Sequence, residues 1–528
     1  MEFLLFSPTI VITIVSILLF LLYIINKKRA KIGTDQMPPQ AKNAWPVIGH
    51  LHLLGGSQLP HKVLGDLAEK YGPIFTIKLG FHQALVVNNA ELARECLTKN
   101  DKAFASRPKA LAFELMAYNY AVLGFTPYGD YWRQVRKIVM LEVLSQRRVE
   151  MLEHLRVSEL RASIKSIYDV WLRNKETGNS DMVKVDISHW FGELILNILV
   201  RILSGKRFSP NDKEGVRFQV VIRKYFELLG AFVASDYIPF LKFFDVGGYR
   251  KRMIKTADDL DEIVEGWLKE QKVKRKSVTQ HEGNQVLINV LINILEGASE
   301  TEFPGFDHDT IIKSTCHQLL TAGLDTTSAT LTWALSLLLN NPKALETAQA
   351  EIDKHVGRER LVEESDMKNL VYLEAIIKET LRLYPAAPLS VPHESIEDCV
   401  VGGYNIPKGT RLLVNISKIH RDTNTWSNPH EFQPERFLTG DHQDVDVKGK
   451  HFDLIPFSSG RRMCPGGILA LHELRITLAT LMQLFVLKRT SSEPIDMTES
   501  FGITICKKMP LEVLLAPRAS SDMYGIVG

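Results

Sequence analysis

Cysteine is scarce in this chain, and neither sign of charge dominates. The 528 residues contain no Cys-x-x-Cys pair, and the formal net charge is only +3. A small, odd number of scattered cysteines is typical of a reducing compartment and argues against a disulfide framework. The near-neutral balance gives no indication of nucleic-acid binding. The five cysteines are Cys96, Cys316, Cys399, Cys464 and Cys506.

One long uncharged apolar run lies near the N-terminus, from Phe3 to Ile25. As a helix it would be about 35 Å long, enough to cross a bilayer core of about 30 Å. A cleaved signal peptide would have basic residues before such a run, whereas here the basic residues of NKKRAK follow it. We therefore predict a membrane signal anchor with a basic stop over residues 1–30, with the rest of the chain in the cytoplasm.

The remaining sequence has no internal repeat and no low-complexity tract. Residues 31–59 contain three prolines and are interpreted as a hinge, residues 60–518 as one large domain, and residues 519–528 as a flexible tail. Helical periodicity dominates the large domain. Four strand-like runs predict a small sheet region: PIFTIKLG and QALVVNN as a hairpin, then RLLVNIS and LEVLLAP. The predicted fold class is mainly α, with the sheet set to one side.

The longest helical pattern runs from Thr310 to Leu339, and Asp307 or Asp309 is a candidate N-cap. It is apolar on most sides, as expected of a buried central helix. Its middle reads AGLDTTS, an unfavourable choice because glycine costs about 1 kcal/mol relative to alanine in a helix. Such a cluster often widens or kinks a helix at a functional site. The alternative is that each hydroxyl bonds its own backbone.

Two further clusters carry charge at helical spacing. Glu379 and Arg382 are three residues apart and can pair on one helix face, with Arg436 of FQPERF as a later partner. We assign these three residues a structural role, although exposed pairs of this kind usually contribute little. Trp132 and Arg136 are four apart, and their N–H groups suit a buried carboxylate. Taken alone, that second stretch also fits an ordinary basic helix face.

The stretch PFSSGRRMCPGG places Cys464 between two arginines and a Pro-Gly-Gly that opens an apolar helix. Amides at a helix start, together with arginines, lower a thiol pKa and favour the thiolate. Three interpretations remain: a small buried hydrophobe, a nucleophile, or a metal ligand. No base for a nucleophile and no zinc-type spacing is evident. A metal would therefore bring its own ligands, as in haem.

These motifs together resemble the cytochrome P-450 monooxygenases. Phe457-x-x-Gly460-x-Arg462-x-Cys464-x-Gly466 is similar to their haem-binding signature, and Ala322-Gly323-x-Asp325-Thr326 to their oxygen-activating helix motif. Glu379-x-x-Arg382, PERF and Trp132-x-x-x-Arg136 also match in order and spacing. The resemblance covers essentially the whole chain. It implies a helical prism with a long central helix and a smaller β region.

The resemblance implies a role for each matching residue. Cys464 would be the axial thiolate of haem b, while Thr326 and Asp325 would support dioxygen and deliver protons to it. Propionates would be held by Trp132 and Arg136, and by Arg462. The haem-binding loop would also include Phe457, Gly460 and Gly466, and the substrate pocket Ala322, Ala387 and Phe501.

The implied reaction is insertion of one oxygen atom into an apolar small molecule. Dioxygen would be the second substrate, and electrons would come from NADPH through a membrane-bound NADPH–cytochrome reductase. Arg133, Lys137 and Arg461 are candidates for the surface that meets this reductase. The anchor implies a single-pass protein of the endoplasmic reticulum membrane, with its catalytic domain facing the cytoplasm.

A finer resemblance is to plant family 82, carried by AWPVIGHLHLL, LYPAAPLSVPHESIEDCVVGGYNIPKGTRL and GKHFDLIPFSSGRRMCPG. That family oxidises alkaloids, flavonoids, furanocoumarins and terpenoids. The pocket segments AFELMAYNYAVLGF and ESFGIT are largely apolar, which favours a bulky terpenoid or flavonoid over an alkaloid or furanocoumarin. A reductase-independent haem-thiolate isomerase or dehydratase is less consistent with the intact Asp325-Thr326 pair. A non-catalytic haem protein is the third alternative.

Overall fold

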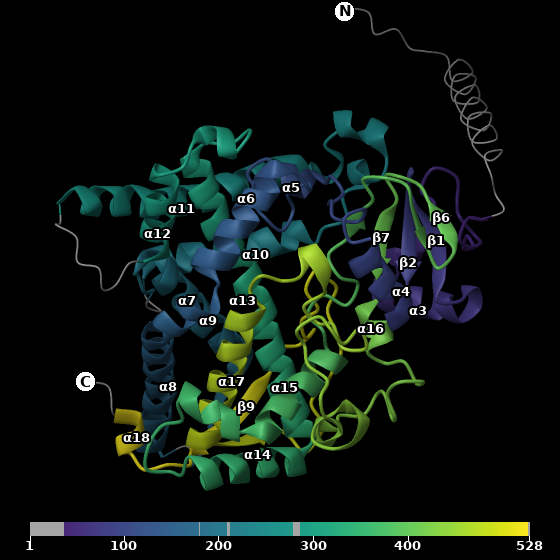
Figure 1. The fold of residues 1–528 in the computed structure, drawn as a ribbon. Helices are drawn as coiled ribbons and strands as arrows, with labels where there is room; N and C mark the ends of the chain where they lie inside the picture. The colour runs from purple at the N-terminus through teal and green to yellow at the C-terminus, as the bar shows by residue number, and fades with distance from the viewer. Residues whose placement is uncertain (1–35, 179, 209–211, 278–285, 526–528) are drawn as a thin grey trace, which may run out of the picture.

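The computed structural model describes residues 36–178, 180–208, 212–277 and 286–525. The predicted anchor over residues 1–30 and the first residues of the hinge lie outside them. The body is mainly helical, with the N-terminal strands and the later β6 and β7 gathered at one edge (Figure 1). The predicted fold class agrees with this architecture.

Helices build the body. The longer ones are α3 (Pro60–Tyr71), α6 (Asp130–Ile138), α8 (Glu153–Glu176), α9 (Ile187–Ser204), α10 (Lys213–Leu229), α11 (Tyr249–Ser277), α12 (Leu287–Glu296), α13 (His308–Asn340), α14 (Pro342–His355), α15 (Val371–Leu383) and α17 (Gly467–Leu484). Short ones are α2 (Leu51–Leu54), α4 (Ala90–Arg94), α5 (Leu111–Met116), α7 (Gln146–Met151), α16 (Ile416–Ile419) and α18 (Asp522–Gly525).

The strands form three small sheets. The first has the order β1-β2-β7-β4, the second β3-β9-β8, and the third pairs β5 with β6. In the first sheet β1 and β2 form an antiparallel hairpin and β7 joins β2 in parallel. All four predicted runs are strands, but LEVLLAP (β9) lies in the second sheet and not in the sheet region that the other three share. The strands are β1 (Ile74–Leu79), β2 (His82–Val87), β3 (Val183–Asp186), β4 (His393–Glu394), β5 (Cys399–Val401), β6 (Tyr404–Ile406), β7 (Arg411–Val414), β8 (Phe485–Arg489) and β9 (Glu512–Pro517).

The central helix α13 crosses the body and packs against α9 and α17 (Figure 1). Its N-cap is Asp307, whose side chain accepts a 2.8 Å hydrogen bond from the amide of Thr310. The helix is assigned as α-helical throughout, so AGLDTTS does not interrupt it with a widened turn. Hydroxyls such as that of Thr326 donate to the carbonyl one turn back and leave the helical ladder intact. Gly323 permits close packing, since a Cβ there would lie 3.2 Å from Leu199 of α9.

Among the described residues, α9 is the one helix long and apolar enough to cross a membrane. Most of its side chains are buried inside the body, against α8 and α13. It is therefore a core helix by its packing, and it does not bear on the predicted N-terminal anchor.

The predicted flexible tail is wrong for residues 519–525. Helix α18 places Tyr524 in the core at 2% exposure, stacked on Tyr168 of α8 with ring centroids 4.1 Å apart. The Tyr524 hydroxyl donates to the carbonyl of Leu484 and accepts from the amide of Arg518 at 3.1 Å. Only two apolar side chains, Met523 and Tyr524, make this contact. Such a short segment gives no periodic signal in the sequence.

Candidate active site

The Cys464 loop joins a 3-10 turn (Gly460–Arg462) to the start of α17. The amide of Cys464 donates to the carbonyl of Phe457 at 2.9 Å, which closes the loop. The amides of Gly466 and Gly467 donate to the Cys464 sulfur, as the Pro-Gly-Gly spacing indicated. The side chain is accessible because it lines an internal cavity of about 320 Å³.

The electrostatics of the sulfur differ from the expectation. Burial raises the pKa of the Cys464 thiol, and this effect outweighs the lowering by the Gly466 amide, Arg136 and the Gly467 amide. The polypeptide alone therefore does not stabilise a free thiolate. A coordinated metal ion deprotonates a thiol ligand outright, so this environment suits a ligand sulfur better than a free nucleophile.

The cavity brings together motifs that lie far apart in the sequence. Helix α13 contributes one wall, with Thr326 and Ala322, and the Cys464 loop contributes another. Helix α6 supplies Trp132 and Arg136, the pair of N–H donors that the sequence singled out. The predicted site residues that line this cavity are Trp132, Arg136, Ala322, Thr326, Ala387, Phe457, Arg462, Cys464 and Gly466.

Three of the residues predicted for catalysis, haem binding or the substrate pocket lie outside the lining. Asp325 sits beside it, where Thr504 and Cys506 donate to its carboxylate and burial raises the pKa of that carboxyl. Phe501 does not line this cavity; its side chain is 58% exposed, and Ile503 and Thr504 of the same segment line the cavity instead. The prediction that Phe501 lines the substrate pocket is therefore wrong. Ile503 and Thr504 line the cavity in its place, because the chain bends after Phe501.

Gly460 is the third residue outside the lining, and its position explains the glycine. Its φ is +71°, and a Cβ there would lie 2.3 Å from the carbonyl oxygen of Leu97. Only glycine tolerates this approach without displacing the backbone. Gly460 therefore shapes the loop and does not contribute a surface to the cavity.

A basic wall faces the sulfur side of the cavity. Arg462 donates to the carbonyls of Ala105 and Thr126, each at 2.6 Å, and its guanidinium lies 4.4 Å from the ring centroid of Trp132. Arg136 donates to the carbonyl of Met463 at 2.7 Å. Helix α6 is thus tied directly to the Cys464 loop.

Arg107 completes this wall, although the sequence did not single it out as a charged group of the site. It lines the cavity, is buried, and donates to the carbonyls of Gly124 and Val391. A single arginine in the stretch AFASRPKAL carries no spacing signal, although an arginine in so apolar a stretch is unusual. Its role emerges only when the loop folds over the cavity.

The basic wall has an unbalanced positive charge. Burial, Arg107 and Arg136 lower the pKa of Arg462 to about 8, and burial lowers that of Arg107 to about 9. Within the described part of the chain, none of the three arginines pairs with a carboxylate. Nearby, the buried Nε2 of His393 has no hydrogen-bond partner. A bound group with carboxylates would relieve this repulsion.

The donor set therefore fits haem. The cavity combines a sulfur ligand for iron with cationic and N–H groups for two propionates, and the remaining walls are largely apolar. No group of three metal-binding side chains occurs among the described residues.

Glu473 of α17 is a second residue that sequence analysis missed. It lines the cavity, is buried, and lies with Oε1 2.9 Å from Nε of Arg156. Burial raises its pKa to about 7. Within an apolar helix its burial was not predictable, because the position lies on no motif.

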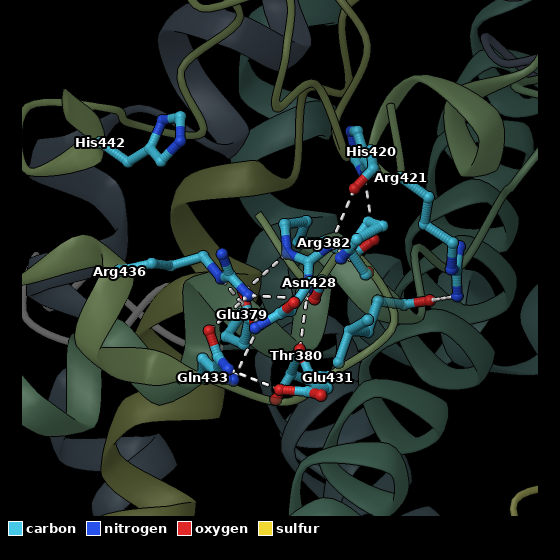
Figure 2. Close-up of polar contacts among 12 residues, drawn as sticks. Glu379, Thr380, Arg382, His420, Arg421, Asn428, Glu431, Gln433, Arg436 and His442 are labelled. Atoms are coloured by element: carbon cyan, nitrogen blue, oxygen red, sulfur yellow. Dashed lines mark hydrogen bonds and ion pairs between the residues drawn. The ribbon is translucent and has the colours of Figure 1, made fainter. Parts of the chain in front are cut away.

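The Glu379–Arg382–Arg436 cluster, for which the sequence predicted a structural role, is buried and closely hydrogen-bonded. Glu379 and Arg382 are both 0% exposed and form two hydrogen bonds of 2.7 and 2.8 Å, and Arg436 adds a third of 3.1 Å to Glu379 (Figure 2). Arg382 also donates to the carbonyls of His420 and Pro429. The cluster therefore ties α15 to the long segment that leads to the Cys464 loop, and it does not line the cavity.

Comparison with known proteins identifies relatives along nearly the whole chain. Residues 38–514 match the family model described as Cytochrome P-450. Demethylepipodophyllotoxin synthase of Sinopodophyllum hexandrum is 50% identical, with 96% of each chain covered. Strychnine-10-hydroxylase of Strychnos nux-vomica is 48% identical, covering 99% of this chain and 100% of the relative.

Two further comparisons concern subfamily and fold. Cytochrome P-450 82A2 of Glycine max is 47% identical, with 99% of each chain covered, which assigns the sequence to the neighbourhood of plant family 82. A solved zebrafish cytochrome P-450 with progesterone superposes with a TM-score of 0.72 at 27% identity, covering 88% of this chain and 100% of that one.

Proposed function

Since the chain belongs to the cytochrome P-450 family and is a monooxygenase of that family, we propose that it hydroxylates a bulky, mostly apolar plant metabolite with electrons from NADPH. The observation that supports this most is the meeting of Cys464 and Thr326 on one cavity with apolar walls. Bound haem supplies the iron that activates dioxygen and transfers one oxygen atom to the substrate.

The proximal residues hold the cofactor. Cys464 would ligate the iron. The amides of Gly466 and Gly467, which donate to its sulfur, would reduce the electron density that the thiolate gives to the iron. Arg462, Arg136 and Trp132 would hold the propionates, and Arg107 would assist them. Gly466 is the N-cap of α17, and its amide donates to the sulfur from there.

Two residues of α13, Thr326 and Asp325, would deliver protons to the cavity. The Thr326 hydroxyl donates to the carbonyl of Ala322 at 2.7 Å, so its lone pairs remain to accept a hydrogen bond from the cavity. Asp325 lies next to it with a raised pKa, which suits a group that holds a proton before passing it on. Each turnover consumes two protons and two electrons, because the second oxygen atom leaves as water.

The substrate is proposed to be a ring-bearing compound such as a flavonoid or terpenoid. The cavity walls that α9 and α10 contribute are aliphatic and aromatic, among them Ile195, Leu199 and Phe226, and α13 adds Leu319 among several threonines. Such walls exclude water and favour apolar ligands. Oxidation of an alkaloid by the same mechanism is the second candidate, favoured by the 48% identity to a strychnine hydroxylase.

The proposed partners follow from the anchor and the reaction. A membrane-bound NADPH–cytochrome reductase would supply electrons, and the protein would reside in the endoplasmic reticulum membrane as a single-pass protein facing the cytoplasm. Exposed cations such as Arg133 and Arg461 are candidates for its docking, although each also contacts a neighbouring aspartate.

Turnover by microsomes tests this function. The full chain is co-expressed with a plant reductase and supplied with a panel of flavonoids, terpenoids and alkaloids, and products are identified by mass spectrometry. We expect products heavier by one oxygen atom that require NADPH. Product formation without NADPH would instead identify an isomerase or dehydratase, and exclusive conversion of cationic alkaloids would overturn the substrate preference.

A further inference from the structure

We infer that Gln318 is a specificity-determining residue that donates a hydrogen bond from its side-chain amide to a neutral oxygen acceptor, such as a carbonyl, on the ring-bearing substrate. This inference rests on the proposed function and narrows its substrate class. Gln318 lies on α13 one turn before Ala322 and two turns before Thr326, and it lines the same cavity.

The orientation of the Gln318 amide is set by the backbone. The amide N–H of Gly124 donates to Oε1 of Gln318 at 2.7 Å. A backbone N–H can only donate, so the atom that it meets is the carbonyl oxygen and the –NH₂ group takes the other position. Gly124 also lines the cavity, and the described residues provide no hydrogen-bond acceptor to Nε2.

A second hydrogen bond, to the carbonyl of Gly124, fixes the position of this residue. Its carbonyl accepts a 3.1 Å hydrogen bond from Nε of Arg107 on the basic wall. A Cβ at position 124 would lie 2.8 Å from Oε1 of Gln318, closer than real Cβ contacts. The absence of a side chain at Gly124 is therefore what allows the glutamine to hold this position.

Four of the five threonine hydroxyls on this wall have already used their donors. Thr315, Thr321, Thr326 and Thr330 line the cavity, and each hydroxyl donates to a helix carbonyl four residues back. Gln318 is the single carboxamide among the described residues that line the cavity. Its two N–H groups, together with the Thr327 hydroxyl, are thus the side-chain donors on the α13 wall for which the described residues provide no acceptor.

A neutral acceptor is the ligand group that suits this donor. A cationic amine cannot accept from an N–H, and no carboxylate lines the α13 wall beside Gln318. A site built to hydrogen-bond one substrate oxygen discriminates against the analogue that lacks it, because the buried donor is then left unpaired.

The test compares flavanone with flavan, which differ in the ring carbonyl alone. Binding to the haem-loaded full chain is titrated through the spin-state shift of the ferric haem. We expect flavanone to bind about 5- to 10-fold more tightly than flavan. In Gln318→Met the ratio should fall to about one through weaker flavanone binding, and Gly124→Ala should reduce it in the same way. Ser314→Ala is the matched control, because its buried hydroxyl lies on α13 outside the cavity lining.

Three results would overturn the inference: equal binding of the two compounds by the wild type, an unchanged ratio in Gln318→Met, or no spectral shift with either compound. Failure of the proposed function has a different signature. It would appear as the absence of NADPH-dependent product from every class in the panel, whatever the binding ratio.

Discussion

The guanidinium of Arg462 lies over the indole ring of Trp132, with 4.4 Å between its central carbon and the ring centroid. The two residues are 330 positions apart, and their contact holds α6 against the loop that carries Cys464. Arg136, one turn after Trp132, reinforces it through the carbonyl of Met463. The position of the sulfur therefore depends on a helix from the first third of the chain.

Cys464→Ser should abolish the thiolate–haem absorption band that the reduced carbon monoxide complex gives. A serine hydroxyl cannot replace the thiolate as a strong axial donor. The control is Cys506→Ser, whose sulfur lies 3.9 Å from the carboxylate of Asp325 and which does not line the cavity. Survival of the band in Cys464→Ser would contradict the ligand assignment.

Thr326→Ala should retain haem and bind substrate, but release more hydrogen peroxide per molecule of product. The variant removes the hydroxyl acceptor that faces the cavity. Peroxide and product are measured against NADPH consumed. Ser328→Ala serves as the control, since its hydroxyl donates to Leu324 and lies outside the cavity lining. Unchanged coupling in Thr326→Ala would place proton delivery elsewhere.

Glu379→Gln should destabilise the fold by about 3–5 kcal/mol, because it leaves two buried arginines without their counter-charge. Chemical denaturation followed by haem absorbance and by circular dichroism measures the loss. Asp130→Asn breaks the exposed pair with Arg133 and should have no measurable effect. Equal stability of the two variants would show that the buried cluster contributes little.

Acid should destabilise the protein through His420. Burial and Arg382 lower its pKa from 6.5 to about 3, and its Nε2 accepts from the amide of Ile455. The unfolded chain binds this proton more readily, so the stabilisation is fully present above pH 6.5 and is lost as pH falls toward 3. The loss is about 2 kcal/mol at pH 5.

His420→Gln tests this sign, because glutamine can accept from the Ile455 amide without titrating. Its melting temperature should fall less between pH 7 and pH 5 than that of the wild type. His355→Gln changes an exposed histidine at the end of α14 and should keep the wild-type slope. A His420→Gln slope equal to the wild type would assign acid sensitivity to other groups.

Tyr524→Ala should lower stability by about 3 kcal/mol, because it removes a buried ring and its hydrogen bond to Leu484. Thermal unfolding of the holoprotein provides the measurement. Asp522→Ala, at an exposed position two residues earlier, is the control. Identical melting of Tyr524→Ala and wild type would restore the original prediction of a loose tail.

The local sequence pattern was sufficient to predict the helices and strands, and the motifs were sufficient to predict the class of reaction. The N-cap Asp307, the hairpin of β1 and β2, and the Glu379–Arg382 pair all depend on residues close in sequence, where spacing determines which side chains meet. Family resemblance then assigned Cys464 and Thr326 to one site. The sequence on its own thus determined the fold class and the type of reaction, and it predicted the residues that we propose take part in it.

Tertiary structure decided what depends on contacts between distant segments. Arg107 joins the basic wall, Phe501 lies outside the lining, and Tyr524 packs against Tyr168, because loops fold over surfaces that the local sequence does not specify. Burial reversed the expected shift of the Cys464 pKa, since desolvation depends on everything that surrounds the thiol. The contact of Gly124 with Gln318, 194 positions apart, has the same origin.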